Sequence, residues 1–461
     1  MYLRHHGRRG VYPALAELRA LDYSRKASAE IARRQQEKLV AILRQAYDNS
    51  PWYREKFISA GVKREDIRNS KALSALPILT RSDMYDHMDS ILSTAYPRNQ
   101  LLETKTGGST MEPLIFYRDP YTLDYRIALE LFLAEVASWR IGEWWVNIWG
   151  SLSDIPDKYG FEKLKYTIAN SLSRRMLAFD STFLSEDDYP KLAKIIQRKN
   201  VTLLFGYPRG VAGFARWAID HRPDLQSLRG VICTAEPLAP EDRAVMREAF
   251  PTPIYDRYAS REVGMISQEC GGCDGLHILT DNVFVEFAPH SDDSVDPEAG
   301  GRIIITDLVN TGMPLIRYDT GDVARALPTP ARSCGCRLDG LPLMSAVVGR
   351  FADFLVRNDG TRFVGLDVPG MRMAEQGWVK QIQYVQTDID TVTVRLIRGR
   401  NFSEAFYPYI QKQVDHVFKS HVQLTFTLVE SIPRTRSGKS MYSICQIPPQ
   451  RIAELSQSAR S

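Results

Sequence analysis

The sequence predicts an α/β protein of two domains: a large N-terminal domain with more than one β-sheet and a small α+β domain at the C-terminus. Its 461 residues exceed the size of one ordinary domain. Short apolar runs alternate with helical patterns over residues 146–250, as in a sheet whose faces are covered by helices. A separate hairpin, helix and strand pattern starts after residue 353, so we assign residues 1–348 and 349–461 to the two domains.

Helices are predicted over the first hundred residues and again before the sheet. Apolar residues recur at helical spacing over 28–48, and Ser50-Pro51 ends this run. A longer and more apolar helix is predicted over 122–141, where Gly142 stops it.

The remaining elements follow in chain order. Buried strands are predicted at 146–149, 176–179, 201–205 and 231–234, and helices at 188–199, 210–221 and 240–250. Two β-rich segments, VFVEFA and GRIIITDL, lie within 283–308 on either side of an acidic loop at 290–299. The C-terminal pattern comprises a hairpin at 379–398, a helix at 402–419 and a strand at 422–432.

Composition and charge argue against several classes of protein. The net charge of +4 is too small to indicate binding to nucleic acid or to an anionic membrane. No apolar run reaches the ~18–20 residues that a membrane helix needs. Pro13 and Glu17 interrupt the N-terminal segment, which therefore lacks a signal-peptide core, and we expect a cytoplasmic protein.

A glycine-rich segment, TKTGGSTMEP at 104–113, is the first candidate for binding phosphate. Its glycines free the backbone and its hydroxyls can donate to phosphate oxygens. The spacing fits neither a Walker loop nor a Rossmann fingerprint, and a plain turn would explain the segment equally well.

Four later segments point to a specific chemistry. They are YASRE at 258–262, RYDTGD at 317–322, GRFAD at 349–353 and PRTRSGK at 433–439. In this order and spacing, the series resembles the motifs of the adenylate-forming superfamily of acyl-CoA synthetases, adenylation domains and luciferases. AYDNSPWYREKF, LPILTRSDM, FGYPRG and TAEPL further resemble the phenylacetate–CoA ligase and CapK-like branch, and the resemblance extends from about residue 35 to about 445.

The resemblance implies an enzyme that uses ATP and Mg²⁺ to convert a carboxylic acid into an acyl-adenylate and then transfers the acyl group to CoA. It also implies a large adenylation domain and a small mobile C-terminal domain that rotate about a hinge near 349–353. CapK-like relatives leave another acceptor open: an amine, a hydroxyl or a carrier thiol in natural-product or polysaccharide biosynthesis. A carrier protein and an oligomer are both compatible with the sequence.

The resemblance also assigns residues to ATP. The phosphate loop is Thr106, Gly107, Gly108, Ser109 and Thr110. Thr234, Ala235 and Glu236 match the lining of the adenine site, and Tyr258 matches the tyrosine that packs on adenine. Asp322 matches the acceptor of the ribose hydroxyls, and Glu262 matches the carboxylate that holds Mg²⁺.

Two basic residues complete the catalytic set. Arg350 matches the family arginine near the phosphates, and Lys439 matches the lysine that reaches the carboxylate and the α-phosphate. The sequence departs from the family pattern at Met111, where glycine is usual, and at Ala352, where an acid is usual. These departures keep a second hypothesis open, a degenerate homologue that binds nucleotide without catalysis.

Six cysteines in a protein expected to be cytoplasmic argue against disulfides and for metal binding. Cys270 and Cys273 form one pair, and Cys334 and Cys336 form another about 60 residues later. Two such pairs predict a tetrahedral Cys₄ site that holds a structural Zn²⁺. His277 is an alternative ligand, although a core histidine explains it more simply; an iron–sulfur centre and unligated thiols also stay open.

Aromatic residues near the strand ends are candidates for the acid pocket. They are Trp149, Phe205 and Tyr207, which would suit a flat aryl or heteroaryl acid. The same residues would be equally at home in a core, so the sequence does not identify the acid.

Overall fold

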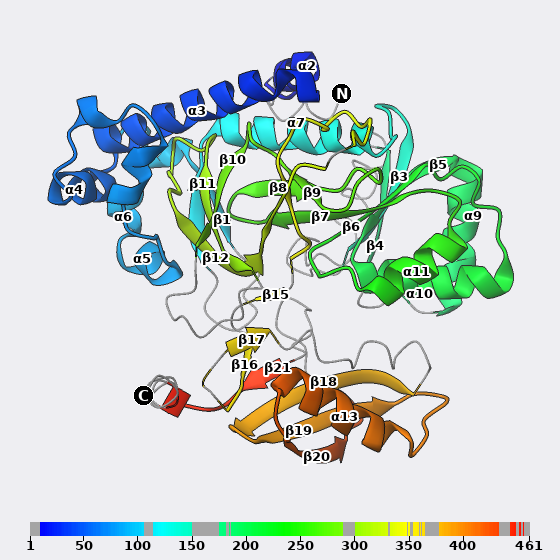
Figure 1. Ribbon diagram of the computed structural model, residues 1–461. Coiled ribbons are helices and arrows are strands. Elements are labelled where there is room, and N and C mark those ends of the chain that lie inside the picture. Colours follow the sequence, from blue (N-terminus) through cyan, green and yellow to red (C-terminus); the bar gives the residue numbers. More distant parts are fainter. Residues whose placement is uncertain are drawn as a thin grey trace. The chain divides into compact units, whose positions relative to one another are not determined.

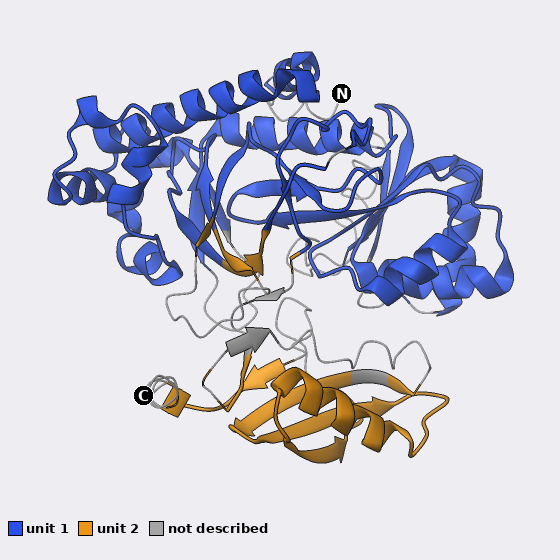
Figure 2. Cartoon of the chain, in the orientation of Figure 1, with its two compact units in different colours: residues 1–286, 304–320, 326–346 blue, residues 287–303, 321–325, 347–461 orange. Residues whose placement is uncertain are grey.

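The computed structural model describes residues 10–105, 114–149, 175–180, 184, 186–288, 300–330, 332–347, 349–350, 354–358, 360, 362–364, 378–432, 443–448, 451–452 and 455. The chain forms two compact units (Figure 2). The first comprises residues 1–286, 304–320 and 326–346, and the second comprises 287–303, 321–325 and 347–461. The hinge near 349–353 stays a prediction.

The N-terminal segment is helical, as predicted. It contains α2 (Val11–Ala20), α3 (Ser28–Asn49), α4 (Pro51–Ser59), α5 (Arg81–Asp86) and α6 (Met88–Ile91). The apolar positions of α3 that follow the helical period, Ile31, Leu39, Ile42, Leu43 and Ala46, are all buried. The break at Ser50 is also confirmed, because Pro51 occupies the first turn of α4, where its missing N–H costs nothing.

Helix α7 (Pro120–Val136) begins at a side-chain cap and ends earlier than the sequence suggested. The carboxylate of Asp119 accepts from the backbone N–H of Thr122 and so satisfies an N-terminal donor. The predicted end at residue 141 is wrong, because the chain leaves the helix after Val136 and Ser138 adopts a left-handed φ of 68°. Helices α2 and α7 pack together through buried residues that include Leu15, Leu129 and Phe132.

A nine-stranded mixed sheet forms the centre of the first unit (Figure 1). Its order is β13-β14-β9-β8-β7-β6-β5-β3-β4. The strands are β3 (Trp144–Trp149), β4 (Met176–Asp180), β5 (Val201–Gly206), β6 (Gly230–Thr234), β7 (Ile254–Ser260), β8 (Gly264–Gln268), β9 (Leu276–Ile278), β13 (Ala326–Leu327) and β14 (Leu343–Met344). Strands β3 to β7 pair parallel with one another. Strand β8 pairs antiparallel with both β7 and β9.

Helices cover both faces of the parallel part of this sheet. Helices α9 (Tyr189–Lys199), α10 (Pro208–His221) and α11 (Pro240–Ala249) pack on one face, against Val146, Leu204 and Val231 (Figure 1). Ala134 and Ala137, at the end of α7, pack on the opposite face against Phe205 and Ile232. The α/β prediction and its strand–helix alternation are confirmed.

Smaller sheets complete the fold. Strands β1 (Leu102–Lys105) and β2 (Ile115–Arg118) form an antiparallel pair, as do β16 (Phe354–Val356) and β17 (Arg362–Val364). Strands β10 (Val283–Ala288), β11 (Gly301–Asp307), β12 (Tyr318–Ala324) and β15 (Gly349–Arg350) form a four-stranded sheet. More than one sheet in the large domain is therefore confirmed.

The C-terminal part of the second unit has its own sheet and core. Strands β18 (Val379–Asp388), β19 (Thr391–Arg398), β20 (Gln423–Leu428) and β21 (Ser443–Cys445) pair in the order β20-β19-β18-β21. Helix α13 (Phe406–Phe418) covers this sheet with four buried residues one helical face apart: Phe406, Ile410, Val414 and Phe418. The predicted helix and last strand exist but are shorter than expected. No helix within the described ranges is long and apolar enough to cross a membrane.

Candidate active site

The carboxyl ends of the parallel strands bring several predicted residues together, as is usual for ligand sites of open α/β sheets. Thr234 ends β6 and lies in register with Arg257 on β7, directly before Tyr258. The Thr234 hydroxyl donates to the backbone oxygen of Arg257 at 2.8 Å. Ala235 follows with a φ of 72°, a strained conformation for a residue with a Cβ and one that is frequent at functional sites. The predicted adenine segment is therefore next to the predicted adenine-packing tyrosine.

Glu262 lies in the turn between β7 and β8 and is only 8% exposed. The Tyr318 hydroxyl donates to Glu262 Oε1 at 3.4 Å, a long hydrogen bond. No other hydrogen bond or ion pair to this carboxylate occurs in the described part of the chain. A buried carboxylate with free acceptor capacity is a fit site for a cation.

Two arginines that the sequence analysis did not select, half-buried Arg118 and buried Arg126, lie near this turn. Arg118 donates to the backbone oxygen of Arg261. Arg126, on α7, donates to Asp307 Oδ2 at 2.6 Å. Burial and then the charge of Arg126 lower the pKa of Arg118 to about 9, against the opposing charges of Asp307 and Glu262. Neither arginine lies in a recognisable sequence motif. Their partners are far away in the sequence, so only the folded structure shows these contacts.

Asp322 and Arg350 occupy opposite positions of the antiparallel pair β12 and β15. The register thus joins the predicted ribose acceptor and the predicted phosphate arginine. The description of Arg350 is limited to its backbone. Several other predicted residues lie outside the described ranges: Thr106, Gly107, Gly108, Ser109, Thr110, Met111, Ala352 and Lys439.

The three aromatic candidates for the acid pocket lie together. The rings of Trp149 and Phe205 stack with centroids 5.7 Å apart, and Trp149 meets Tyr207 edge-on at 4.8 Å. Phe205 and Tyr207 are buried, and Trp149 is half-buried. A guanidinium that the sequence analysis missed, that of Arg257, lies 5.4 Å from the centre of the Phe205 ring.

Comparisons with known proteins bear on the family resemblance and on the fold. Residues 357–445 match the CapK C-terminal domain. Protein CapK of Staphylococcus aureus is 23% identical over 402 residues, which cover 85% of each chain. A phenylacetate-coenzyme A ligase of Aromatoleum evansii is 26% identical over 338 residues, covering 71% of this chain and 72% of that protein. A solved structure of 2-hydroxyisobutyryl-CoA ligase in the postadenylation state superimposes with a TM-score of 0.68 at 16% identity, covering 92% of this chain and 91% of that one.

The chain is thus similar in sequence to phenylacetate-coenzyme A ligases and to Protein CapK, and it shares its fold with 2-hydroxyisobutyryl-CoA ligase. The predicted resemblance and fold class are thereby confirmed. The roles of individual residues and the domain limits stay predictions.

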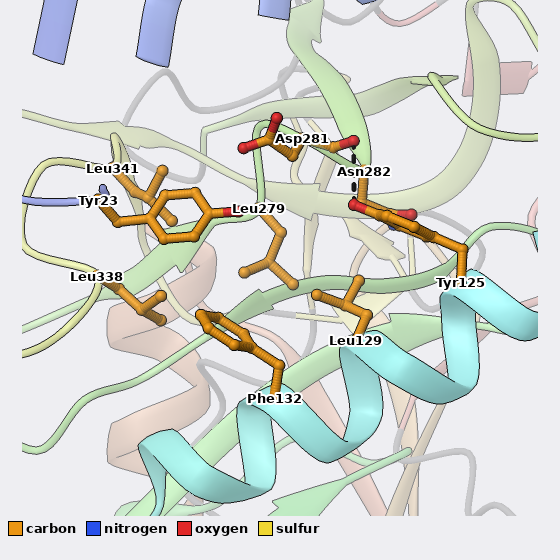
Figure 3. Close-up of a pocket in the computed structure, with 9 residues that line it drawn as sticks. All are labelled: Tyr23, Tyr125, Leu129, Phe132, Leu279, Asp281, Asn282, Leu338 and Leu341. Atoms are coloured by element: carbon orange, nitrogen blue, oxygen red, sulfur yellow. Dashed lines mark hydrogen bonds between the residues drawn. The ribbon is translucent and has the colours of Figure 1, made fainter. Parts of the chain in front are cut away.

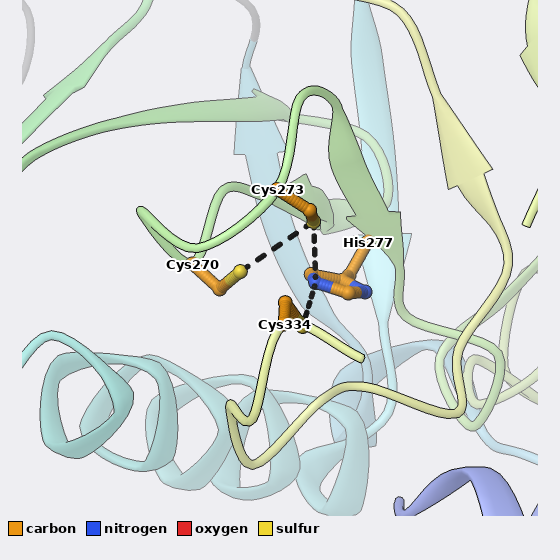
Figure 4. A group of neighbouring side chains, drawn as sticks. All are labelled: Cys270, Cys273, His277 and Cys334. Carbon is orange, nitrogen blue, oxygen red and sulfur yellow. Dashed lines mark hydrogen bonds between the residues drawn. The ribbon is translucent and has the colours of Figure 1, made fainter. Parts of the chain in front are cut away.

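The chain also contains a compact cysteine and histidine cluster, defined by Cys270, Cys273, His277, Cys334 and Cys336. Figure 4 shows the first four of these side chains. The ligand atoms of the first four all lie within 4.8 Å of one another. Sulfur–sulfur distances are 3.6 Å within the first pair and 3.2 Å within the second. The His277 Nε2 lies 3.5 Å from Cys273 Sγ, 3.8 Å from Cys334 Sγ and 3.5 Å from Cys336 Sγ.

These distances suit a tetrahedral metal. Zn–S bonds of ~2.3 Å place the sulfurs of one tetrahedron about 3.8 Å apart. The loops also need a glycine to meet, because a Cβ on Gly272 would come within 2.7 Å of the Cys334 oxygen. The structure brings together all four predicted cysteines and adds His277 as a fifth donor, so a simple core role for this histidine no longer fits.

The pKa values of the thiols in the cluster also favour a bound cation. The hydrogen bond from Cys336, helped by His277, lowers the pKa of Cys270 to about 3. Burial and then interaction with Cys270 raise the pKa of Cys273. Neighbouring thiolates repel one another, so their joint ionisation requires a cation.

The cluster is tied to the N-terminal helices through Asp339. This carboxylate accepts from Cys334 N at 3.0 Å and from Arg25 Nε at 3.1 Å. Gly340 N donates to the backbone oxygen of Tyr23, and Arg25 also donates to the backbone oxygen of Arg332 at 2.6 Å. The loop that carries the second cysteine pair therefore holds the segment between α2 and α3.

A small cavity lies beside this junction (Figure 3). Its volume is about 10 Å³, enough for a single water molecule at most. Tyr125, which lines it, donates to the backbone oxygen of Asp281 at 3.3 Å. The cavity is far too small for an acid substrate and belongs to the core.

Proposed function

We propose that this chain activates a carboxylic acid with ATP and transfers the resulting acyl group to a second acceptor. The observation that carries the proposal is the buried, under-coordinated carboxylate of Glu262 in the turn that follows Tyr258 on β7, whose neighbour β6 ends at Thr234. The match to phenylacetate-coenzyme A ligases over more than two thirds of the chain supports the same chemistry.

The proposed first step forms the acyl-adenylate, a mixed anhydride of the carboxylic acid and the α-phosphate. A carboxylate oxygen of the acid attacks the α-phosphorus of ATP, and the bond to the pyrophosphate oxygen breaks with its electron pair. Glu262 would hold Mg²⁺, which supplies charge neutralisation for the phosphates when it is bound. Arg118 holds the backbone of the turn that carries Glu262, and Tyr318 orients the carboxylate.

The roles of the remaining predicted residues belong to this proposal. The loop from Thr106 to Thr110 would receive the β- and γ-phosphates, and Asp322 the ribose hydroxyls. Lys439 would bridge the acid carboxylate and the α-phosphate. Arg350 would contact the phosphates from its place opposite Asp322.

In the second step a nucleophile attacks the acyl carbon and AMP leaves with its phosphate oxygen. We propose CoA as the nucleophile, since several relatives are named as coenzyme A ligases. The match to Protein CapK favours a second candidate, transfer to an amine, hydroxyl or carrier thiol in biosynthesis. The stacked pair of Trp149 and Phe205 supports an aryl or heteroaryl acid.

We propose that the cysteine and histidine cluster binds Zn²⁺ as a structural ion. Four cysteines and His277 offer more donors than the four that zinc takes, and zinc has no redox chemistry. This ion takes no part in either step. A cytoplasmic location is part of the same proposal.

Acid-dependent exchange of pyrophosphate into ATP tests the function. With Mg²⁺ and no acceptor, a panel of aryl, heteroaryl and aliphatic acids should give exchange with at least one class. Lys439→Ala should abolish exchange while ATP still binds. A chain that binds ATP yet exchanges with no acid would instead be the degenerate nucleotide-binding homologue.

A further inference from the structure

Arg257 is a buried cation for which the described residues provide no ion-pair partner. It lies on β7, and its side chain is only 3% exposed. Its Nε donates to the amide oxygen of Gln268 at 2.7 Å, and its guanidinium lies over the ring of Phe205. Its Nη2 is buried and has no hydrogen-bond partner in the described part of the chain.

The charge on Arg257 persists at neutral pH. Burial lowers the pKa of Arg257 to about 10, and the charge of Glu130 on α7 opposes that effect. Glu130 acts through space and forms no ion pair with Arg257 in the described structure. Arg126, by contrast, is equally buried but donates to Asp307 at 2.6 Å. A buried guanidinium served only by a neutral amide and a ring is costly unless a ligand completes its contacts.

Two further polar atoms on the same side of the sheet lack partners. Asn147 lies in register with Phe205, which lies in register with Ile232 on β6. Ile232 is in turn in register with Tyr255, and Arg257 lies two residues further along β7. Residues in register, and residues two apart on one strand, point to the same face of a sheet. Asn147 on β3 and Arg257 on β7 therefore lie on the face of Phe205, on opposite sides of it. The Asn147 Oδ1 and the Trp145 Nε1 are both buried without a hydrogen bond within the described ranges. This face therefore combines aromatic rings with unsatisfied polar groups, as ligand sites do.

We propose that Arg257 selects the acid by binding a second anionic group on it, so that the substrate is a dicarboxylic acid or another acid with an added anionic substituent. The inference rests on the proposed function. Arg257 would act as a specificity-determining residue, with its Nη2 donating to the substituent. The stacked rings of Trp149 and Phe205 would contact the part of the acid between its two anionic groups.

The second group is a better partner for Arg257 than the carboxylate that reacts. The reacting carboxylate loses its charge when the adenylate forms. A dedicated, buried cation would stabilise that carboxylate more than the transition state and would slow the step. A substituent that keeps its charge throughout can be bound with equal strength in both states, and it then fixes which acid enters.

Matched pairs of acids test the proposal by pyrophosphate exchange. Benzoate is compared with isophthalate and terephthalate, and butyrate with glutarate. The wild-type chain should use at least one diacid with a kcat/KM at least 10-fold above that of its monoacid. Arg257→Met should remove this preference by lowering kcat/KM at least 100-fold for the diacid and much less for the monoacid. Arg257→Lys should keep part of the preference, because it keeps the charge.

Arg243→Met is the matched control. Arg243 is a half-buried arginine that pairs with Glu269 at 2.9 Å and lies on α11, across the sheet. Its replacement should change the rates for monoacids and diacids by the same factor. A thermal shift on adding the diacid, present in the wild type and lost in Arg257→Met, provides a readout other than turnover.

Three results would overturn the inference while leaving acid activation intact. They are a wild-type preference for monoacids, equal loss of both acids in Arg257→Met, and an unchanged preference in that variant. The first result is measured on the wild-type chain. It can therefore overturn the proposal even if Arg257→Met does not fold. Failure of the proposed function looks different, because the wild type would then exchange with no acid at all.

Discussion

The cysteine and histidine cluster and the strand ends around Phe205 are built in opposite ways. In the cluster the donors come from two short loops and from β9, their contacting pairs lie 3.2–3.8 Å apart, and the second loop is held by backbone and carboxylate contacts. Around Phe205 the residues come from separate strands, and buried polar atoms of Trp145, Asn147 and Arg257 have no partner in the described structure. The first arrangement is closed and suits a structural ion, whereas the second needs a ligand to complete it. Changes in the cluster should therefore alter stability, and changes at the strand ends should alter activity.

Glu262→Gln should have the largest effect of these substitutions. It should lower activity and leave stability almost unchanged. Loss of the charge that is proposed to hold Mg²⁺ should lower kcat/KM for exchange by roughly 10³-fold. The Mg²⁺ concentration for half-maximal rate should rise, and the melting temperature should change little. Glu143→Gln, on a carboxylate that pairs with Arg229, is the control and should leave the Mg²⁺ dependence unchanged. A large fall in the melting temperature of Glu262→Gln would show that Glu262 mainly stabilises the fold.

Removal of the proposed metal ligands should have the next largest effect. It should lower stability rather than activity. The double variant Cys273→Ser and Cys334→Ser should lose one bound zinc per chain, measured by elemental analysis. Because binding energy of a structural metal is folding energy, the melting temperature should fall by roughly 5 °C or more. Cys445→Ser, outside the cluster, should keep both zinc and stability. An intact zinc content in the double variant would contradict the assignment.

Asp281→Asn should produce a smaller loss that depends on pH. Burial raises the pKa of Asp281, but Lys38 and Arg34 outweigh it and lower the pKa below its ordinary value. A lowered folded pKa contributes stability above the unfolded pKa of ~3.9, and this stability is lost as pH falls through the folded pKa. The variant should therefore be about 1–2 kcal/mol less stable than wild type at pH 7 by urea unfolding. The difference should shrink toward pH 3; a constant difference would exclude the ion pair as its cause.

Tyr318→Phe should give the smallest effect, again on activity. It removes the 3.4 Å hydrogen bond that orients Glu262. We expect about a 5-fold lower kcat/KM, equivalent to about 1 kcal/mol, with a higher requirement for Mg²⁺. Stability should stay within about 0.5 kcal/mol of wild type. An unchanged Mg²⁺ dependence would show that Tyr318 does not position this carboxylate.

Local patterns were sufficient to predict most of the fold and the cysteine cluster. The helical period of α3 predicted its buried face, and the two cysteine pairs predicted a cluster of thiols without knowledge of the fold. The end of α7 was wrong because Ser138 takes a left-handed conformation that its sequence does not demand.

Residues that act through distant pairing could not be predicted in the same way. Arg257 was passed over because its neighbours in the sequence say nothing of Phe205, 52 positions earlier, or of Gln268 across a hairpin. Arg126 and Asp307 are 181 residues apart, and His277 contacts Cys336 although 59 residues separate them. A buried charge without a partner is visible only once the strands are in register.

We propose that the strand ends of the large sheet activate an acid, whereas the cysteine cluster only stabilises the fold. The most direct test is acid-dependent pyrophosphate exchange by the wild-type chain and by the Cys273→Ser and Cys334→Ser variant, held well below its melting temperature. We predict exchange in both, at rates within a few-fold, with at least one acid of the panel. Two results would contradict this division of roles. One is loss of exchange in a variant that has lost zinc but is still folded, and the other is the lack of exchange with every acid of the panel.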